Sequence, residues 1–165
     1  MTKPLSLFAA MLLASAARAA TADLSNAPLA DVEALALDGR RDAMHALCYR
    51  HKYGIDAPQD FGKALRWCSV AAVVGVDSSQ VLLAEMFHDG DGVPQDFGRA
   101  RQWYEAGAEQ GHPHALLMLF YMYDGGGGVE VDRPRALRYL ERAAADGYEK
   151  AVEELDRQRA ASRVI

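Results

Sequence analysis

The sequence predicts an all-α fold, an α/α superhelix (solenoid) of 36-residue two-helix repeats. First, the five letters PQDFG occur twice, at Pro58–Gly62 and at Pro94–Gly98, 36 residues apart. Second, the same offset aligns glycines, aspartates and aromatic residues in three successive units. Third, each unit holds two stretches with apolar residues at helical spacing. Single helix pairs cannot bury their apolar faces alone, so such units gain a common core by stacking.

Residues 1–19 have the pattern of a secretory signal peptide. A short positive start is followed by an apolar run that ends near Ala14, and Ala17–Ala19 fits the small-residue cleavage pattern. We expect cleavage after Ala19, with Ala22 as the alternative. The run is too short to span a bilayer, so we expect no membrane span in the mature chain and a periplasmic or secreted location.

The composition is that of an ordinary soluble domain with an acidic balance. The 165 residues include 18 Lys and Arg against 23 Asp and Glu, which gives a net charge of −5 at pH 7. Half of the residues (50%) are hydrophobic, enough for a core in a chain of this length. A nucleic-acid surface would need clustered basic residues, so no nucleic-acid partner is expected.

The expected elements follow the period along the chain. Residues 28–40 form an N-terminal half-repeat helix that starts at Pro28. Three complete repeats then follow, at residues 41–76, 77–112 and 113–148. Residues 149–165 form a C-terminal capping helix with a charged outer face. The two half units cover the open ends of the stack, as stacked repeats require.

The second unit shows why each repeat is expected to contain two helices. Residues 79–88 carry apolar side chains at helical spacing, and Gly90 suits the left-handed residue that ends a helix. After a loop, Asp96 is placed to cap the next helix, whose apolar face includes Ala100 and Trp103. Equivalent positions recur in register in all three units: Gly54, Gly90 and Gly126; Asp60, Asp96 and Asp132; Ala64, Ala100 and Ala136; Trp67, Trp103 and Tyr139.

This pattern resembles the Sel-1-like repeat, a relative of the tetratricopeptide repeats. The second unit matches it best, with Leu83, Phe87, Gly90, Gly92, Val93, Asp96, Arg99, Ala100, Trp103, Tyr104, Ala108 and Gly111. The first unit departs most, because His51 replaces the aromatic residue, Asp56 the second glycine and Ala57 the valine. The resemblance implies an α-solenoid that binds proteins or peptides, and it supplies no catalytic residues.

The two cysteines, Cys48 and Cys68, are expected to form a disulfide within the first unit. Cys48 lies on the helix face turned toward the partner helix, where the related repeats often have glycine, and Cys68 follows Ala64 by one helical turn. Both lie a few residues from the hinge of an antiparallel pair, and an oxidising compartment favours the bond. The bond would staple the unit that has the poorest loop.

The sequence predicts neither a metal site nor an active site. His112, His114 and His88 are ligand types, but no set of three or four ligands shares a helix face. No Ser-His-Asp or Cys-His arrangement falls on matching positions. The glycine run at Gly125–Gly128 lacks the preceding strand and Lys-Ser/Thr pair of a phosphate-binding loop. We therefore expect no enzyme activity and no cofactor.

The remaining candidate is the concave surface, which the first helices line in related solenoids. The positions expected to face it are His45, Tyr49, Lys52, Val81, Glu85, His88, Leu117 and Tyr121. Residues 116–123 have no polar face, so the stack either buries this helix on both sides or leaves an apolar groove for a partner segment. The expected function is an interaction module or scaffold for a protein or peptide partner. An envelope-associated hydrolase and a self-assembling structural module are the alternatives.

Overall fold

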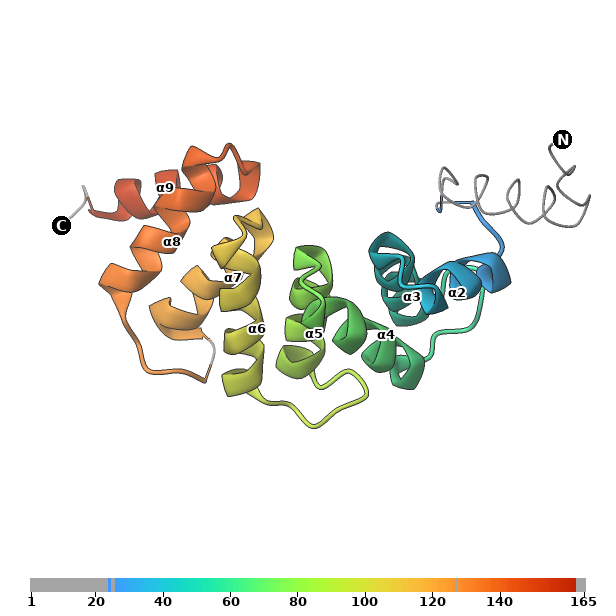
Figure 1. Ribbon diagram of the computed structural model, residues 1–165. Coiled ribbons are helices and arrows are strands. Elements are labelled where there is room, and N and C mark those ends of the chain that lie inside the picture. Colours follow the sequence, from blue (N-terminus) through green and yellow to red (C-terminus); the bar gives the residue numbers. More distant parts are fainter. Residues whose placement is uncertain (1–23, 25, 127, 163–165) are drawn as a thin grey trace, which may run out of the picture.

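A computed structural model describes residues 24, 26–126 and 128–162, and it contains helices and loops but no strand within that part (Figure 1). The prediction of an all-α solenoid is therefore confirmed. The elements, in chain order, are α2 (Leu29–Leu37), α3 (Arg41–Tyr53), α4 (Phe61–Val73), α5 (Asp77–Asp89), α6 (Phe97–Glu109), α7 (Pro113–Tyr121), the π-helical turn η1 (Met122–Gly126), α8 (Arg133–Ala145) and α9 (Glu149–Ser162). The signal peptide expected at residues 1–19 lies outside the described residues. None of the described helices is long and apolar enough to cross a membrane.

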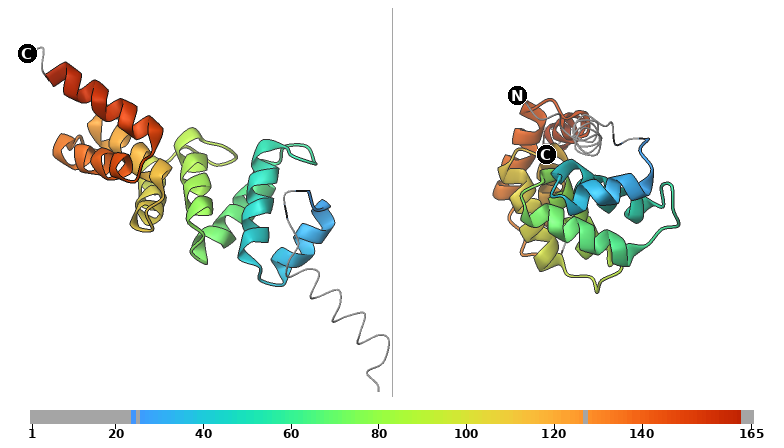
Figure 2. Two further views of the ribbon diagram at one scale, coloured as in Figure 1. Left: turned by 90° about the horizontal axis from the view of Figure 1, so that it is seen from above. Right: turned by 45° about the vertical axis from the view of Figure 1, so that its right-hand side comes forward.

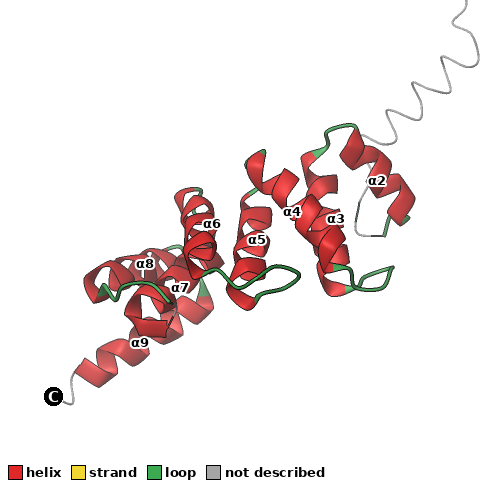
Figure 3. Cartoon of the chain, turned by 90° about the horizontal axis from the view of Figure 1, so that it is seen from below, coloured by secondary structure: helices red, strands yellow, loops and turns green. Residues whose placement is uncertain are grey.

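The helices follow one another along an arc from α2 to α9, and each packs against its neighbours in the chain (Figures 1 and 2). The pairs α3–α4, α5–α6 and α7–α8 form three units, and the loops inside the first two lie along one edge of the stack (Figure 3). Helix α3 also contacts α5 directly. We call the side formed by α3, α5, α7 and α9 the first-helix face, and the side formed by α2, α4, α6 and α8 the second-helix face.

Aspartate caps start the second helix of every unit. The Oδ1 atoms of Asp60, Asp96 and Asp132 accept hydrogen bonds from the backbone N–H three residues on, at 2.8, 2.9 and 3.0 Å. Each cap satisfies a backbone donor that the first turn leaves without an intrahelical partner. The N–H of each aspartate also donates to the carbonyl at the repeat-equivalent end of the first helix, for example Asp96 to Phe87 at 2.8 Å. The same local sequence thus builds the same helix–loop–helix geometry three times.

Glycine in the loops of the second and third units lets each unit fit against the one before it. Gly92 has φ +72°, and a Cβ there would lie 2.6 Å from Cβ of Phe61, at the start of the preceding second helix. Gly128 has φ +64°, and a Cβ there would likewise overlap the ring of Phe97, at the start of the second helix in the preceding unit. Asp56 occupies this position in the first unit and keeps the left-handed backbone, with φ +60°.

Helix α7, the first helix of the third unit, belongs to the core rather than to an open groove. Its residues Leu116, Leu117, Leu119 and Phe120 are at most 3% exposed. They share one apolar cluster with residues of the neighbouring helices, among them Tyr104, Leu140 and Ala151. The stack therefore buries α7 on both sides, because α9 covers the flank that a fourth unit would otherwise cover.

The predicted disulfide between Cys48 and Cys68 is present and clips α3 to α4. The sulfur atoms are 2.07 Å apart, the Cα atoms 4.7 Å, and both side chains are fully buried. In the other two units, different residue pairs occupy the positions that correspond to Cys48 and Cys68. The second unit fills them with Ala84 and Tyr104, and the third unit fills them with Phe120 and Leu140. A covalent bond in the first unit thus replaces what apolar packing does in the others.

His51 is the one polar side chain at a position that is aromatic in the other two units. It is 1% exposed, and neither ring nitrogen has a hydrogen-bond partner among the described residues. Burial lowers the pKa of His51 below its ordinary value of 6.5. Four charged groups act on the ring: Lys63 and Arg66 lower the pKa further, while Asp60 and Glu33 raise it. The folded state therefore favours the neutral imidazole.

The variant His51→Phe is expected to increase the free energy of unfolding by about 1–3 kcal/mol, because it removes two buried polar atoms that lack partners. Because the folded state lowers the pKa of His51, protonation favours the unfolded chain, and the wild type loses stability as pH falls below 6.5. The advantage of the variant should therefore be larger at about pH 5.5 than at about pH 7.5, measured by urea unfolding. Phe87→His makes the converse change in the second unit and should destabilise the protein. Equal stability of wild type and His51→Phe at both pH values would contradict this account.

Candidate functional site

The structure separates the predicted contact residues into exposed and buried sets. Tyr49 and Tyr121 are 44% and 42% exposed on the first-helix face. Val81 and Leu117 are each 3% exposed and lie in the core cluster, so their prediction as contact residues is wrong. The reason is that their helix positions turn toward the neighbouring units, whereas periodicity within a single helix does not distinguish that side from the open surface.

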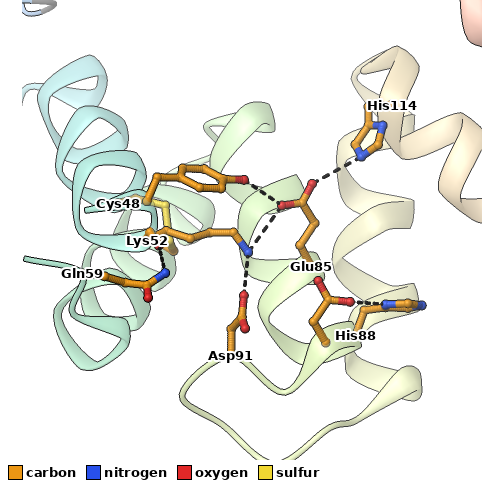
Figure 4. Close-up of polar contacts among 10 residues, drawn as sticks. Cys48, Lys52, Gln59, Glu85, His88, Asp91 and His114 are labelled. Carbon is orange, nitrogen blue, oxygen red and sulfur yellow. Dashed lines mark hydrogen bonds and ion pairs between the residues drawn. A yellow bond between two sulfur atoms is a disulfide. The ribbon is translucent and has the colours of Figure 1, made fainter. Parts of the chain in front are cut away.

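A network of polar contacts on the first-helix face centres on Glu85 of α5 (Figure 4). Its Oε2 atom lies 3.5 Å from Nζ of Lys52 and accepts a hydrogen bond from the Tyr53 hydroxyl at 3.4 Å, both on α3. Its Oε1 atom lies 3.3 Å from Nε2 of His114, in the first turn of α7. One carboxylate thus receives groups from both neighbouring units.

Lys52 organises this network from below the surface. It is only 4% exposed, and its Nζ atom also donates to Oδ2 of Asp91, at 3.1 Å, in the loop after α5. Its backbone carbonyl accepts a hydrogen bond from Gln59 at 2.7 Å. A nearly buried ammonium requires such compensation, so two carboxylates are held close to it. Lys52 therefore holds Glu85 and Asp91 in position from a nearly buried site, whereas the sequence predicts it on the open concave surface.

Aromatic side chains lie beside the network on α3. The ring centroids of Tyr49 and Tyr53 are 4.7 Å apart, and the Tyr53 residue is 48% exposed. Partial burial, together with the negative charge of Glu85, raises the pKa of Tyr53 to about 12, so its hydroxyl stays protonated and can donate. The site thus combines two exposed aromatic rings, two carboxylates and one lysine.

Three other predicted residues lie apart from this centre. His45 bonds through Nδ1 to Oγ of Ser79 at 2.9 Å, and burial lowers its pKa. His88 contacts Asp89 at 2.7 Å and does not join the Glu85 network (Figure 4). Tyr121 lies near the charges of α9. Its burial, and next the negative charge of Glu154, raise its pKa.

Sequence reasoning missed Tyr53 and His114. Tyr53 follows Tyr49 by one helical turn, so the i, i+4 spacing was a usable signal. His114 offered no such signal. Its role depends on how α7 is placed relative to Glu85 in the preceding unit, a relation that the pattern of one unit does not contain.

The described residues do not form a recognisable catalytic arrangement on this face. Ser79 lies against His45, as a nucleophile lies against its base, but Ser79 is fully buried and a substrate could not reach it. Among these residues, no group of three or more His, Cys, Asp and Glu side chains is placed to hold a metal ion. The exposed groups of the site are aromatic rings, hydroxyls and carboxylates carried by helices of three units.

Comparison with known proteins gives one family and several similar structures. The model of the Sel1 repeat matches residues 41–72, 77–112 and 113–148. The chain is similar to the crystal structure of a Sel1 repeat protein from Oxalobacter formigenes, with 37% identity and a TM-score of 0.69 over 78% of this chain and 96% of that one. A protective antigen of uropathogenic Escherichia coli strains, which displays an SLR fold, has 25% identity and a TM-score of 0.76 over 92% of this chain and 36% of that one.

A third similar structure is the cysteine rich protein B of Helicobacter pylori. It is 20% identical with a TM-score of 0.61, over 79% of this chain and 98% of that one, so the likeness concerns the fold. No curated protein matches the chain. The fold comparisons and the repeat matches agree on one architecture, a stack of successive helix pairs.

Proposed function

The chain belongs to the Sel1 repeat family, and from that premise we propose that it is an exported interaction module that binds a protein or peptide partner through its first-helix face. Repeats of this family commonly serve as protein–protein interaction modules. The observation that carries the proposal is the Glu85 network with its two exposed tyrosines, because it lies across three units and is held rigid by them. A rigid surface of this kind loses little conformational entropy on binding.

The contact set that we propose differs from the one that periodicity alone suggests. It consists of Tyr49, Tyr53, Glu85, His114 and Tyr121, with His45 and His88 at the edges and Lys52 as the organising cation. Two carboxylates, Glu85 and Asp91, share the single lysine, so the centre has an excess of hydrogen-bond acceptors. It suits a segment that offers N–H groups or a basic side chain next to apolar residues, with the tyrosine rings as the apolar surface.

The disulfide supports the proposal that the protein works outside the cytoplasm. Structural disulfides persist in oxidising compartments such as the bacterial periplasm and are rare in the cytosol. The bond between Cys48 and Cys68 closes the first unit, whose loop departs most from the repeat pattern. Cell fractionation with N-terminal sequencing of the recovered chain tests this part of the proposal, and it predicts a chain that begins after Ala19 or Ala22.

The double variant Tyr49→Ala/Tyr53→Ala is expected to recover the partner about tenfold less efficiently than wild type, because aromatic anchors carry much of the binding energy at such surfaces. The measurement is chemical crosslinking and pull-down from an envelope extract, with the recovered protein quantified by mass spectrometry. Both rings are about half exposed, so their loss should leave the fold intact.

The matched control for this experiment is Leu137→Ala. Leu137 is 40% exposed on α8, on the second-helix face, and its loss should not change the recovery of the partner. Equal recovery by the wild type and the double tyrosine variant would refute the first-helix face as the binding surface. A loss shared equally by Leu137→Ala would point to an effect on folding instead.

A further inference from the structure

The second-helix face carries a groove that recurs with the 36-residue period. One copy lies between α4 and α6 over α5, and it is lined by Ser69, Phe87, Arg99 and Trp103 among others. The copy between α2 and α4 is lined by the repeat-equivalent residues Glu33, Lys63 and Trp67, together with the cation Arg66. Each copy therefore places an aromatic ring and a cation on one wall and a third residue, Ser69 or Glu33, on the other.

The third unit shows how such a groove is occupied from within the chain. Glu105, Arg135 and Tyr139 hold the equivalent positions between α6 and α8. Oε1 of Glu105 accepts a hydrogen bond from Nη2 of Arg135 at 2.8 Å and another from the Tyr123 hydroxyl at 2.9 Å. The guanidinium of Arg135 lies over the Tyr123 ring, 4.3 Å from its centroid. The carboxylate of α6 thus bridges to the cation and ring of the next unit.

The groove between α4 and α6 has an arginine and two aromatic rings at the equivalent positions, but no carboxylate is among its lining residues. Ser69 stands where the other two copies have Glu33 and Glu105. The guanidinium of Arg99 lies over the Phe87 ring at 5.4 Å and is 3.3 Å from Oδ2 of Asp96, the residue that caps its own helix. The Arg99 side chain is 64% exposed, so its remaining N–H donors face solvent. The position that a carboxylate fills in the third unit is open here.

We propose that the groove between α4 and α6 binds an acidic segment of a protein partner, with one Asp or Glu carboxylate at the position that Glu105 takes in the next groove. Arg99 donates to this carboxylate, and guanidinium–carboxylate hydrogen bonds are among the stronger ones in proteins. The half-buried rings of Trp103 and Phe87 contact the apolar side chains that flank the acidic residue. This site is separate from the first-helix face and does not depend on it.

The two tryptophans of the chain make the test selective, because each reports on one groove. The probes are three pools of blocked heptapeptides with random flanks and a central residue fixed as glutamate, glutamine or lysine. The indole N–H resonances of Trp67 and Trp103 in the full chain are followed by NMR during titration. The glutamate pool should shift the Trp103 resonance with a dissociation constant about tenfold or more below that of the glutamine pool. The Trp67 resonance should shift less than that of Trp103, because Glu33 already supplies a carboxylate beside Lys63 and Arg66 in that groove.

Variants of the two faces separate this site from the proposed function. Ser69→Glu should supply the missing carboxylate and abolish the Trp103 response, and Arg99→Gln should abolish it by removing the donor. Glu85→Gln, on the first-helix face, should leave the response unchanged. Thermal unfolding checks that each variant folds, and Arg99→Gln, at an exposed position, carries the test if Ser69→Glu does not fold.

Three results would overturn the proposal. The first is equal binding of the glutamate and glutamine pools, and the second is an undiminished Trp103 response in both Ser69→Glu and Arg99→Gln. The third is a concentration-dependent dimer that Ser69→Glu abolishes, because the occupant would then be a second copy of this chain rather than a different partner.

Discussion

Replacing Cys48 and Cys68 together by alanine is expected to lower the free energy of unfolding by about 3 kcal/mol or more. The disulfide closes a separation of 20 residues and thereby restricts the unfolded chain. Both sulfur atoms are also fully buried, so alanine leaves unfilled space between α3 and α4. The effect should be large because no apolar pair occupies this position in the first unit.

Urea unfolding of the wild type and the double alanine variant measures this difference. The variant Cys48→Phe/Cys68→Leu is the matched control, since it copies Phe120 and Leu140 from the third unit. It should regain part of the lost stability by packing, without a covalent bond. An unchanged unfolding midpoint in the double alanine variant would mean that the disulfide adds nothing to the first unit.

Leu117→Ala is expected to lower the free energy of unfolding by about 2–5 kcal/mol. The side chain is 3% exposed and lies in the cluster that joins the second and third units to α9. The loss combines the transfer of buried apolar surface with the cavity that alanine leaves. Calorimetric or urea unfolding measures it directly.

Tyr121→Ala is the control for this prediction, because Tyr121 lies on the same helix but is 42% exposed. It should change the stability by less than about 1 kcal/mol. If Leu117→Ala kept the stability of the wild type and lost only partner binding, α7 would be a binding groove rather than part of the core.

Much of the architecture could be predicted from the sequence because each unit repeats the same local signals. Asp60, Asp96 and Asp132 mark the starts of second helices, and the structure shows a cap at each of them. The cysteine pair could be predicted because both residues fall near the hinge of one helix pair. These features depend on contacts within a unit, which a single period contains in full.

The first-helix face could be predicted only in part, because it depends on the contacts between units. Leu117 and Tyr121 occupy neighbouring turns of α7, yet one is buried by adjacent helices and the other is exposed. Likewise, the contact between Glu85 and His114 joins helices of different units. The rotation of one unit against the next decides both outcomes, and helical periodicity does not specify it.

The two sites that we propose differ in their hydrogen-bonding groups. The first-helix face presents an excess of acceptors around Glu85, whereas the groove between α4 and α6 presents the donor Arg99. Surfaces of opposite character favour different segments and reduce competition between them. If both proposals hold, one short chain binds two segments of one partner or segments of two partners.

Site-specific photocrosslinking in cells that express the full chain tests the central claim most directly. A photoreactive phenylalanine analogue is placed at Tyr53 or, as a control, at Leu137 on the second-helix face, and the covalent adducts are identified by mass spectrometry. The account predicts adducts with a partner protein from the Tyr53 position and not from the Leu137 position. Adducts from Leu137 with none from Tyr53 would contradict binding through the first-helix face.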